Sequence, residues 1–345
     1  MDLMQALVKT SPATTELQRI PIPECGPREV LVKVRAAALC GTDLHIHEWN
    51  PWAQGAGIQL PLVLGHECCG DVIAVGSDAK GARSGDKVAV ETHVPCGECY
   101  QCRSDEQHIC NNLRLFGIHM NGCFAEYAAV PALCAKPIPK EIPYEVGAVM
   151  EPLGTALRAA TEPRVAGANV MVVGCGPIGL FAVAAANTLG AATVFAADIS
   201  PARLAIARRM GATYPVNPLQ DDVAAVVLQA TGGYGADVVI EASGSVEALK
   251  QSFRYLRKGG RMALVGLPGK PIELELGKEV VFKEANIIGI HGRKMFETWA
   301  RMENLLASGK LAAAPAITHV LPLERWQEGI DLARSGQACK VIYTP

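Results

Sequence analysis

The pattern of hydrophobic and polar positions changes about midway along the chain. Up to about residue 150, short β-branched runs alternate with segments rich in Gly and Pro, as at Val30–Val34, Asp71–Val75 and Lys87–Val90. Runs of this kind, bounded by turn residues, are typical of strands. The first part of the chain is therefore predicted to be mostly β, with long loops.

From about Asn169 the pattern alternates between short apolar runs and longer helical ones. It begins with a strand at Val170–Val173, a helix at Pro177–Leu189 and a strand at Thr193–Asp198. Further segments follow in the same alternation: a helix at Pro201–Met210, a strand at Asp237–Glu241, a helix at Val246–Leu256, and strands at Arg261–Val265 and Ile287–Ile290. Repeated strand–helix–strand units predict a doubly wound parallel sheet, so the fold class is α/β.

The last part of the chain returns to mixed elements. A helix is expected at Phe296–Ser308, and the apolar run Lys340–Tyr343 is expected to pair with the first domain. A chain of 345 residues exceeds the size at which one hydrophobic core keeps growing. We therefore expect a mostly β domain at 1–152, a Rossmann-type α/β domain at 153–291, and a return segment at 292–345 that completes the first.

The composition narrows the classes of function that this chain can have. Half of the residues are hydrophobic, 19% are charged and the net charge is -2, which is typical of a globular protein and gives no basis for a nucleic-acid partner. Polar residues and glycines interrupt the apolar stretch Ile178–Ala197, so it is predicted to be a buried helix and strand and not a membrane span. Met1–Lys9 lacks the features of an export signal, so we expect a cytoplasmic protein.

A glycine motif opens the α/β region. Gly174, Gly176 and Gly179 form G-x-G-x-x-G between a predicted strand and a predicted helix, which is the context in which the motif binds a dinucleotide pyrophosphate. Asp198 ends the next strand and favours NAD over NADP, although Arg203 could accommodate a 2′-phosphate. The residues expected at the cofactor are Gly174, Gly176, Pro177, Ile178, Gly179, Asp198 and Arg203.

The twelve cysteines include a dense quartet. Cysteines in a chain without an export signal indicate metal or thiol chemistry more than disulfides. Cys96, Cys99, Cys102 and Cys110 give C-x2-C-x2-C-x7-C in a polar stretch, which predicts a closed tetrahedral zinc site. An iron–sulfur cluster is the alternative, but nothing suggests electron transfer to a second cluster.

A second group of metal-ligating residues is scattered along the first domain. Cys40, His66 and Glu67, with Glu151 further on, offer a thiolate, an imidazole and carboxylates, a set that can hold zinc and leave one position open for substrate. Spacing alone does not connect them. For either fragment by itself, a buried free cysteine or a hydrogen-bonded core histidine is the favoured interpretation.

Together, Gly65-His66-Glu67, the cysteine quartet, the glycine motif and their order resemble the zinc-containing medium-chain dehydrogenases over essentially the whole chain. The resemblance implies a GroES-like catalytic domain beside the Rossmann domain, with one catalytic and one structural zinc ion. It implies that Cys40, His66 and Glu67 ligate the catalytic zinc, that Glu151 is an exchanging ligand, and that the quartet, in a lobe at about 93–113, holds the structural zinc. It also implies a homotetramer.

Further motifs resemble the family members that oxidise the β-hydroxyl of L-threonine. These motifs are Cys40–Ile46, Glu48-Trp49, Glu91–His93, Gly122–Tyr127, Gly292-Arg293 and Met295–Trp299. The chain departs from those members at Thr155 and Arg158, which leaves a polyol, diol or other amino-alcohol dehydrogenase as the alternative. The hypothesis from another functional class is a non-catalytic, zinc-stabilised protein that senses NAD. It would not need Cys40, His66 and Glu67 together.

The resemblance also suggests roles for residues around the second metal group. Thr42 and His45 are expected to carry a proton to solvent, with Thr42 as a plain helix cap the alternative. His93 is expected to contact the substrate, and Arg293 to contact the cofactor unless it is an ordinary surface arginine. If Arg158 faces the substrate, it could pair with a carboxylate.

Overall fold

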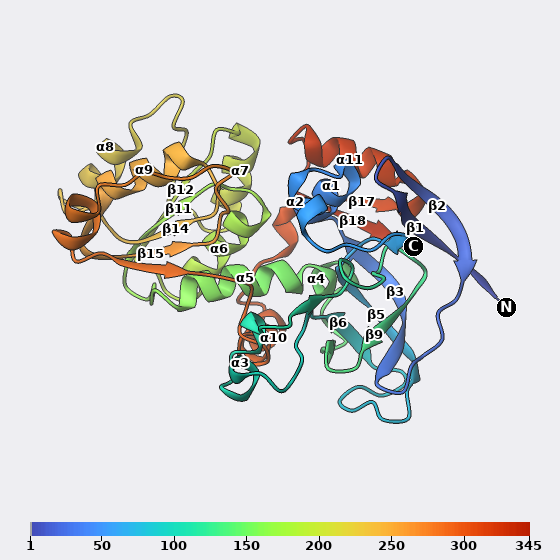
Figure 1. The fold of residues 1–345 in the computed structure, drawn as a ribbon. Helices are drawn as coiled ribbons and strands as arrows, with labels where there is room; N and C mark the ends of the chain where they lie inside the picture. The colour runs from blue at the N-terminus through green and yellow to red at the C-terminus, as the bar shows by residue number, and fades with distance from the viewer. Residues whose placement is uncertain (1) are drawn as a thin grey trace. The chain divides into compact units, whose positions relative to one another are not determined.

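The computed structural model describes residues 2–345, which divide into two compact units (Figure 1). The first unit contains the described residues up to Glu151 together with Ile317–Pro345, and the second contains Pro152–Ala316. The second unit thus extends past the boundary expected at 291/292. It does so because the following residues pack against it: Thr188 donates a hydrogen bond of 2.9 Å to the Lys310 carbonyl.

The first unit is built mainly of antiparallel strands. Its largest sheet has the order β10-β6-β5-β3-β18-β17, with β9 also paired to β3, and a smaller sheet has the order β2-β1-β4. Its strands are β1 (Leu3–Ser11), β2 (Thr14–Pro21), β3 (Glu29–Ala38), β4 (Leu62–Val63), β5 (Glu67–Val75), β6 (Lys87–Val90), β7 (His93–Val94), β8 (Arg114–Leu115), β9 (Tyr127–Pro131), β10 (Ala135–Pro137), β17 (Ile317–Pro322) and β18 (Lys340–Thr344). Its helices are α1 (Gly41–Glu48), α2 (Pro51–Gly55), α3 (Tyr100–Arg103), α4 (Tyr144–Ala148) and α11 (Trp326–Arg334).

Strand β18 returns from the end of the chain to the central strand of this sheet. It pairs antiparallel with β3 through Ile342 opposite Ala38 and Tyr343 opposite Ala37. The Tyr343 ring is fully buried and meets Phe124 edge to face, with ring centroids 5.2 Å apart. The expected pairing of Lys340–Tyr343 with the first domain is therefore confirmed.

The second unit is a six-stranded parallel sheet of order β13-β12-β11-β14-β15-β16 with helices packed against it. Its elements are β11 (Asn169–Val173), α6 (Pro177–Thr188), β12 (Thr193–Ala197), α7 (Pro201–Arg209), β13 (Tyr214–Val216), α8 (Val223–Ala230), β14 (Ala236–Glu241), α9 (Val246–Tyr255), β15 (Leu256–Leu264), β16 (Asn286–Gly289) and α10 (Glu297–Ala307); α5 (Met150–Thr161) begins at the boundary.

Strand β11 shows why the strands of this sheet appear in the sequence as continuous apolar runs. Met171 and Val173 join the buried cluster that includes residues of α8 and α9, while Val170 and Val172 alternate with them and are also fully buried. A strand that is buried on both faces is typical of a parallel sheet covered by helices. The strand order starts from the middle and reverses there, which confirms the doubly wound α/β prediction.

None of the helices in residues 2–345 combines the length and the apolar character that a membrane crossing requires.

Candidate functional site

Three residues far apart in the sequence form a compact group in the first unit. One ligand atom each from Cys40, His66 and Glu67 lies within 4.8 Å of the others. His66 and Glu67 are buried, and the Oε1 atom of Glu67 accepts no hydrogen bond from the described residues. A buried carboxylate oxygen without a partner is costly. A divalent cation bound by these three residues would supply the missing interaction.

The local folding of the chain explains why these side chains converge. Cys40 precedes α1 as its N-cap. His66 directly precedes β5, which begins at Glu67 and pairs with β3 so that Glu67 lies opposite Ala38. Because β3 ends two residues before Cys40, the pairing brings Cys40 close to the adjacent His66 and Glu67.

Asp43 links two of the candidate ligands, a role that the sequence interpretation missed. Its Oδ2 atom accepts a 2.9 Å hydrogen bond from the Cys40 backbone N–H, and its Oδ1 atom lies 3.5 Å from His66 Nδ1. Asp43 is 1% exposed. A carboxylate behind a ligating histidine fixes the ring orientation and raises the basicity of the ligand. The available signal was an acidic residue in the first turn of the helix that Cys40 caps.

The electrostatic field at this group favours a cation. Burial lowers the pKa of His66, but the negative charges of Asp43 and Cys40 outweigh it and raise that pKa well above the usual histidine value. Burial raises the pKa of Glu67, with Lys340 acting against it and Glu151 adding to it. Several acidic groups thus meet in a buried space.

The other residues expected here lie nearby but are less enclosed. Glu151, in the first turn of α5, is half-buried and close enough to interact electrostatically with Glu67. Thr42 Oγ1 lies 3.8 Å from Cys40 Sγ. His45 is exposed, and Asn50 donates its side-chain N–H to His45 Nδ1 at 2.8 Å.

His93 is held by a buried acid. The Glu91 Oε1 atom lies 2.7 Å from His93 Nδ1 and accepts a 2.8 Å hydrogen bond from the His93 backbone N–H. Glu91 is fully buried and His93 is 5% exposed. The pair sets the orientation of the His93 ring, because a single carboxylate oxygen bonds both the ring and the backbone.

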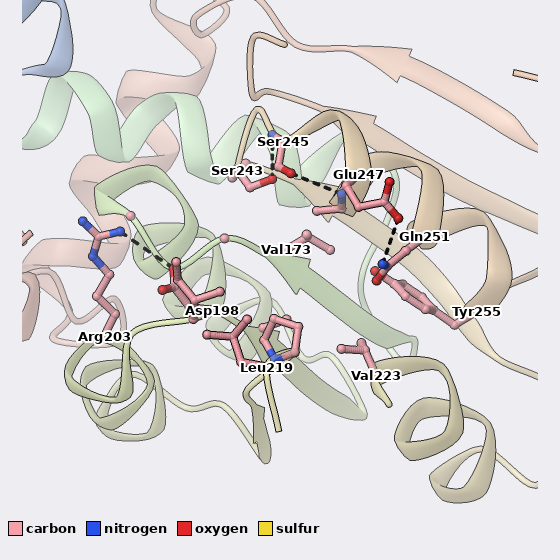
Figure 2. Close-up of a pocket in the computed structure, with 17 residues that line it drawn as sticks. Val173, Asp198, Arg203, Leu219, Val223, Ser243, Ser245, Glu247, Gln251 and Tyr255 are labelled. Atoms are coloured by element: carbon pink, nitrogen blue, oxygen red, sulfur yellow. Dashed lines mark hydrogen bonds and ion pairs between the residues drawn. The ribbon is translucent and has the colours of Figure 1, made fainter. Parts of the chain in front are cut away.

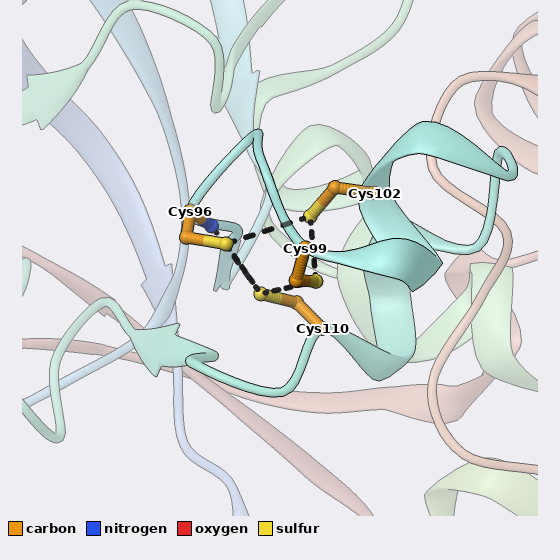
Figure 3. A group of neighbouring side chains, drawn as sticks. All are labelled: Cys96, Cys99, Cys102 and Cys110. Atoms are coloured by element: carbon orange, nitrogen blue, oxygen red, sulfur yellow. Dashed lines mark hydrogen bonds between the residues drawn. The ribbon is translucent and has the colours of Figure 1, made fainter.

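The cysteine quartet forms a second metal-ligating group in the same unit (Figure 3). Sulfur–sulfur distances of 3.5, 3.5, 3.7 and 4.0 Å connect Cys96, Cys99, Cys102 and Cys110 in a ring. A tetrahedral zinc ion with Zn–S bonds of about 2.3 Å separates its sulfurs by about 3.8 Å. All twelve cysteines are outside disulfides. The quartet therefore has the dimensions of a zinc site.

The quartet also favours thiolates at two positions. Backbone N–H groups of Cys102 and Asn111 donate to Cys99 and lower its pKa to about 6, and backbone N–H groups of Glu98 and Cys99 lower the pKa of Cys96. Burial instead raises the pKa of Cys102 to about 12, so a thiolate there needs a cation beside it.

A pocket of about 500 Å³ opens beside the glycine loop of the second unit (Figure 2). Gly174 and Gly176 line it at the end of β11. Gly174 has a φ of 86°, and a Cβ atom on Gly179 would lie 1.7 Å from the Gly174 carbonyl oxygen. The loop therefore requires glycine at both positions, and it brings the N-terminus of α6 towards the pocket.

Asp198 is fixed at the edge of this pocket. Its Oδ2 atom accepts a 2.7 Å hydrogen bond from the Cys175 N–H, and its Oδ1 atom accepts one of 2.8 Å from the Ser200 N–H. Arg203 Nη1 lies 3.9 Å from Asp198, and both residues line the pocket. The carboxylate is thus presented in a fixed orientation with a cation beside it.

Several residues that line the pocket were not identified from the sequence. They come from the loop after β14, from α9 and from the segment after β13: Pro218, Leu219, Ser243, Ser245, Glu247, Gln251 and Tyr255. The available signal was the position of the loop at the carboxyl end of a central strand, where doubly wound sheets bind ligands.

The remaining expected residues lie away from the lining of this pocket. Pro177 and Ile178 form the first turn of α6. Arg293 is fully buried, which excludes an ordinary surface arginine. Its guanidinium lies 5.9 Å from the Trp299 ring centre, and a Cβ atom on Gly154 would meet its side chain.

Arg158 is engaged by other groups of the second unit. Its Nε lies 3.3 Å from Glu162 Oε1, and its Nη1 donates a 3.0 Å hydrogen bond to the His291 carbonyl. Lys294 lies 3.5 Å from the same carboxylate oxygen. With these partners, Arg158 is not a free cation for a substrate carboxylate.

Comparison with known proteins gives matches over both units. A family model described as an alcohol dehydrogenase GroES-like domain matches residues 26–140, and one described as a zinc-binding dehydrogenase matches residues 177–308. The L-threonine 3-dehydrogenase of Symbiobacterium thermophilum is 42% identical over 347 residues, covering 100% of this chain and 98% of the relative. That of Bacillus subtilis is 43% identical over 343 residues, covering 99% of each.

Among solved structures, a putative zinc-binding dehydrogenase from Sinorhizobium meliloti 1021 bound to NADP matches with a TM-score of 0.92. It is 32% identical and covers 100% of both chains.

Proposed function

The chain belongs to the zinc-binding dehydrogenase family, and we propose that it oxidises L-threonine at the β-hydroxyl to 2-amino-3-oxobutanoate with NAD as hydride acceptor. The observation that carries the proposal is the convergence of Cys40, His66 and Glu67, with an unpartnered carboxylate oxygen, in a chain that matches threonine dehydrogenases along its whole length. A protein that only senses NAD would have no use for this ligand set.

In this proposal Cys40, His66 and Glu67 would hold a catalytic zinc ion, with Glu151 as an exchanging ligand. When bound, zinc supplies Lewis-acid chemistry that lowers the pKa of the substrate hydroxyl, as it lowers that of water from about 15.7 to about 7. Three protein ligands leave the fourth position of a tetrahedral site to the substrate. Asp43 keeps the His66 ring in place for this purpose.

The proton released from the substrate hydroxyl needs a path to water. We assign that path to Thr42 and His45, because the Thr42 hydroxyl lies beside Cys40 and His45 is exposed. Asn50 holds the His45 ring through Nδ1. His93, whose ring is oriented by the buried Glu91, is the proposed substrate contact.

The cofactor is assigned to the pocket beside the glycine loop. Gly174, Gly176 and the N-terminus of α6 suit a pyrophosphate. The fixed carboxylate of Asp198 suits a ribose diol and repels a 2′-phosphate, which supports NAD over NADP. Arg203 is drawn towards Asp198, which reduces its availability to a phosphate. The expected contact of Arg293 with the cofactor stays a prediction, because its buried side chain does not line this pocket.

The second zinc ion is assigned to the cysteine quartet, in a structural role. This gives two zinc ions per chain, because the two ligand sets share no residue. Metal analysis of protein prepared without chelator tests the stoichiometry. One zinc per chain that does not increase when zinc is added would mean that the Cys40 set is not a metal site.

We further propose a cytoplasmic homotetramer. The reduced cysteines suit a reducing compartment. Strand β16 ends the six-stranded sheet, and the exposed apolar side chains of Leu276, Val281, Phe282 and Ile287 lie on it or in the segment before it. An open strand edge with apolar neighbours is suited to pairing between chains. Light scattering is expected to give the mass of four chains.

The substrate is tested by comparing catalytic efficiency on L-threonine, L-serine, 2,3-butanediol, sorbitol and threitol. We expect L-threonine to be best, because a site that pairs a charge loses that interaction with a neutral polyol. Higher efficiency on sorbitol or butanediol would make the chain a polyol or diol dehydrogenase, and the segment around Thr155 the place where specificity diverged. No activity with any of the five would support the NAD-sensing alternative.

A further inference from the structure

A lysine is buried directly behind the candidate catalytic metal site. Lys340, the first residue of β18, is 1% exposed. Its Nζ lies 2.5 Å from Glu67 Oε2 and donates a 2.8 Å hydrogen bond to the Leu39 carbonyl. An Nζ–Oε2 separation of 2.5 Å is that of an ion pair, so Lys340 pairs with a candidate metal ligand.

The sheet fixes where this ammonium group lies. Ala38, near the end of β3, pairs with Glu67 of β5 on one side and with Ile342 of β18 on the other. From β18, the Lys340 side chain reaches the end of β3 at Leu39 and the start of β5 at Glu67. Its position thus follows from strand register and does not depend on a flexible loop.

The ion pair makes the two oxygens of the Glu67 carboxylate unequal. Oε2 lies 2.5 Å from the ammonium nitrogen, whereas Oε1 has no ion-pair partner among the described residues; neither oxygen accepts a hydrogen bond of good geometry from those residues. A carboxylate that binds through both oxygens would occupy two positions on a zinc ion. With Cys40 and His66, that would fill all four positions of a tetrahedral site and leave none for a substrate.

Building on the proposed function, we propose that Lys340 is a positioning residue of the catalytic metal site: it retains Glu67 Oε2, so that Glu67 binds the metal through Oε1 alone. The fourth position of the zinc ion then stays open to the alcohol. Nothing in this role requires Lys340 to touch substrate or cofactor.

Charge balance supports the same role. A thiolate at Cys40 and a carboxylate at Glu67 already neutralise a divalent cation, and Glu151 brings a further negative charge. Lys340 interacts electrostatically with Glu151 as well as with Cys40 and Glu67. The ammonium group therefore offsets the surplus carboxylate, which lets Glu151 remain close without displacing Glu67.

The first test measures how fast a chelator removes zinc from the intact protein. The cysteine quartet provides an internal reference, because it shares no residue with this site. We expect Lys340→Met to speed the release of zinc from the site of Cys40, His66 and Glu67 by about 10- to 100-fold, the usual effect of losing a residue that supports a ligand. Release from the quartet should not change. Lys340→Arg, which keeps the charge, should restore most of the slow release.

The second test uses cobalt in place of zinc, because the visible bands of cobalt change with the ligands around it. We expect Lys340→Met to change the bands of the catalytic site and to weaken their response to added alcohol, since the second oxygen of Glu67 can then take the position otherwise left to the alcohol. Lys9→Met is the matched control. Lys9 is another buried lysine, whose Nζ donates to the carbonyls of Pro12 and His47 and to no candidate ligand. Its loss should lower the melting temperature without changing cobalt bands or zinc release.

A double variant keeps the proposal testable if Lys340→Met does not fold. Glu67→Gln/Lys340→Met removes both charges together, so no buried charge is left unpaired. If Lys340 acts only through Glu67, the double variant should release zinc as fast as Glu67→Gln alone. Additional acceleration in the double variant, or unchanged release and cobalt bands in folded Lys340→Met, would overturn the proposal. Zinc release and the cobalt bands without alcohol are independent of which alcohol is oxidised, so a wrong substrate assignment would leave them intact.

Discussion

Replacing Asp198 with alanine should reverse much of the cofactor preference. The carboxylate lines the pocket beside the glycine loop and is held there by two backbone N–H groups. Its hydrogen bonds to a ribose diol would be charge-assisted, each worth about 1.5–3 kcal/mol, so losing one should lower efficiency with NAD by roughly 10- to 100-fold. Two negative charges about 5 Å apart repel by about 3 kcal/mol at an effective dielectric constant of about 20, so efficiency with NADP should rise by roughly 100-fold.

The ratio of efficiencies with NAD and NADP should therefore change by on the order of 1,000-fold, measured from initial rates at saturating alcohol. Asp198→Asn is the matched control, because it keeps the side-chain size and an acceptor oxygen while removing the charge. It should raise the efficiency with NADP and lose less of the efficiency with NAD. Arg203→Ala in the Asp198→Ala background should lower the efficiency with NADP only in part, because most of the gain comes from removing the repulsion. A ratio that stays within threefold of wild type in Asp198→Ala would refute the assigned role.

Three further predictions concern the ligands and the stability of the first unit. Asp43→Asn should speed zinc release from the catalytic site by about 10- to 100-fold in a chelator assay, because the adjacent histidine loses its support; unchanged release would contradict that role. Cys99→Ser should remove one zinc per chain by metal analysis and lower the melting temperature by calorimetry. Asp71 accepts hydrogen bonds from Arg35 and Tyr144 that hold its pKa below the usual range despite partial burial. Asp71→Asn should therefore lower the free energy of unfolding in urea titrations at neutral pH, and the difference should vanish as the pH falls through that lowered pKa.

The alternation of strands and helices could be predicted in the second half because its parallel strands are buried on both faces. The helix expected at Val246–Leu256 spans Val246–Tyr255, and the strand expected at Thr193–Asp198 spans Thr193–Ala197. Helix α8 was missed, because Val223–Ala230 contains a single polar residue, Gln229, and so gives little contrast between a buried and an exposed face. Strand β5 was expected only from Asp71. Its first residues, from Glu67, serve the site and do not follow a strand pattern.

The candidate ligands could be named from the sequence, but not the residues that support them. Cys40, His66 and Glu67 belong to short motifs, whereas Lys340 lies 301 residues from Leu39, to which it donates. No local sequence pattern relates positions so far apart. The pairing of β18 with β3 brings them together. Arg158 is a residue that the sequence offered as a partner for a substrate carboxylate. The structure shows that it is already engaged by Glu162 and the His291 carbonyl.

The strand that carries Lys340 is translated last among the strands described here, and this sets the order in which the two units can complete their sheets. The ribosome adds about 5–20 residues per second, so the 301 residues between Leu39 and Lys340 take about 15 to 60 s to translate. The second unit is one continuous stretch and can complete its sheet during that time, but the first unit lacks two strands until Ile317–Pro345 emerges. During this interval Ala37 and Ala38 of β3 lack their β18 partner, and Glu67 lacks its ammonium partner. The geometry around Cys40, His66 and Glu67 is therefore complete only after Ile317–Pro345 has been translated.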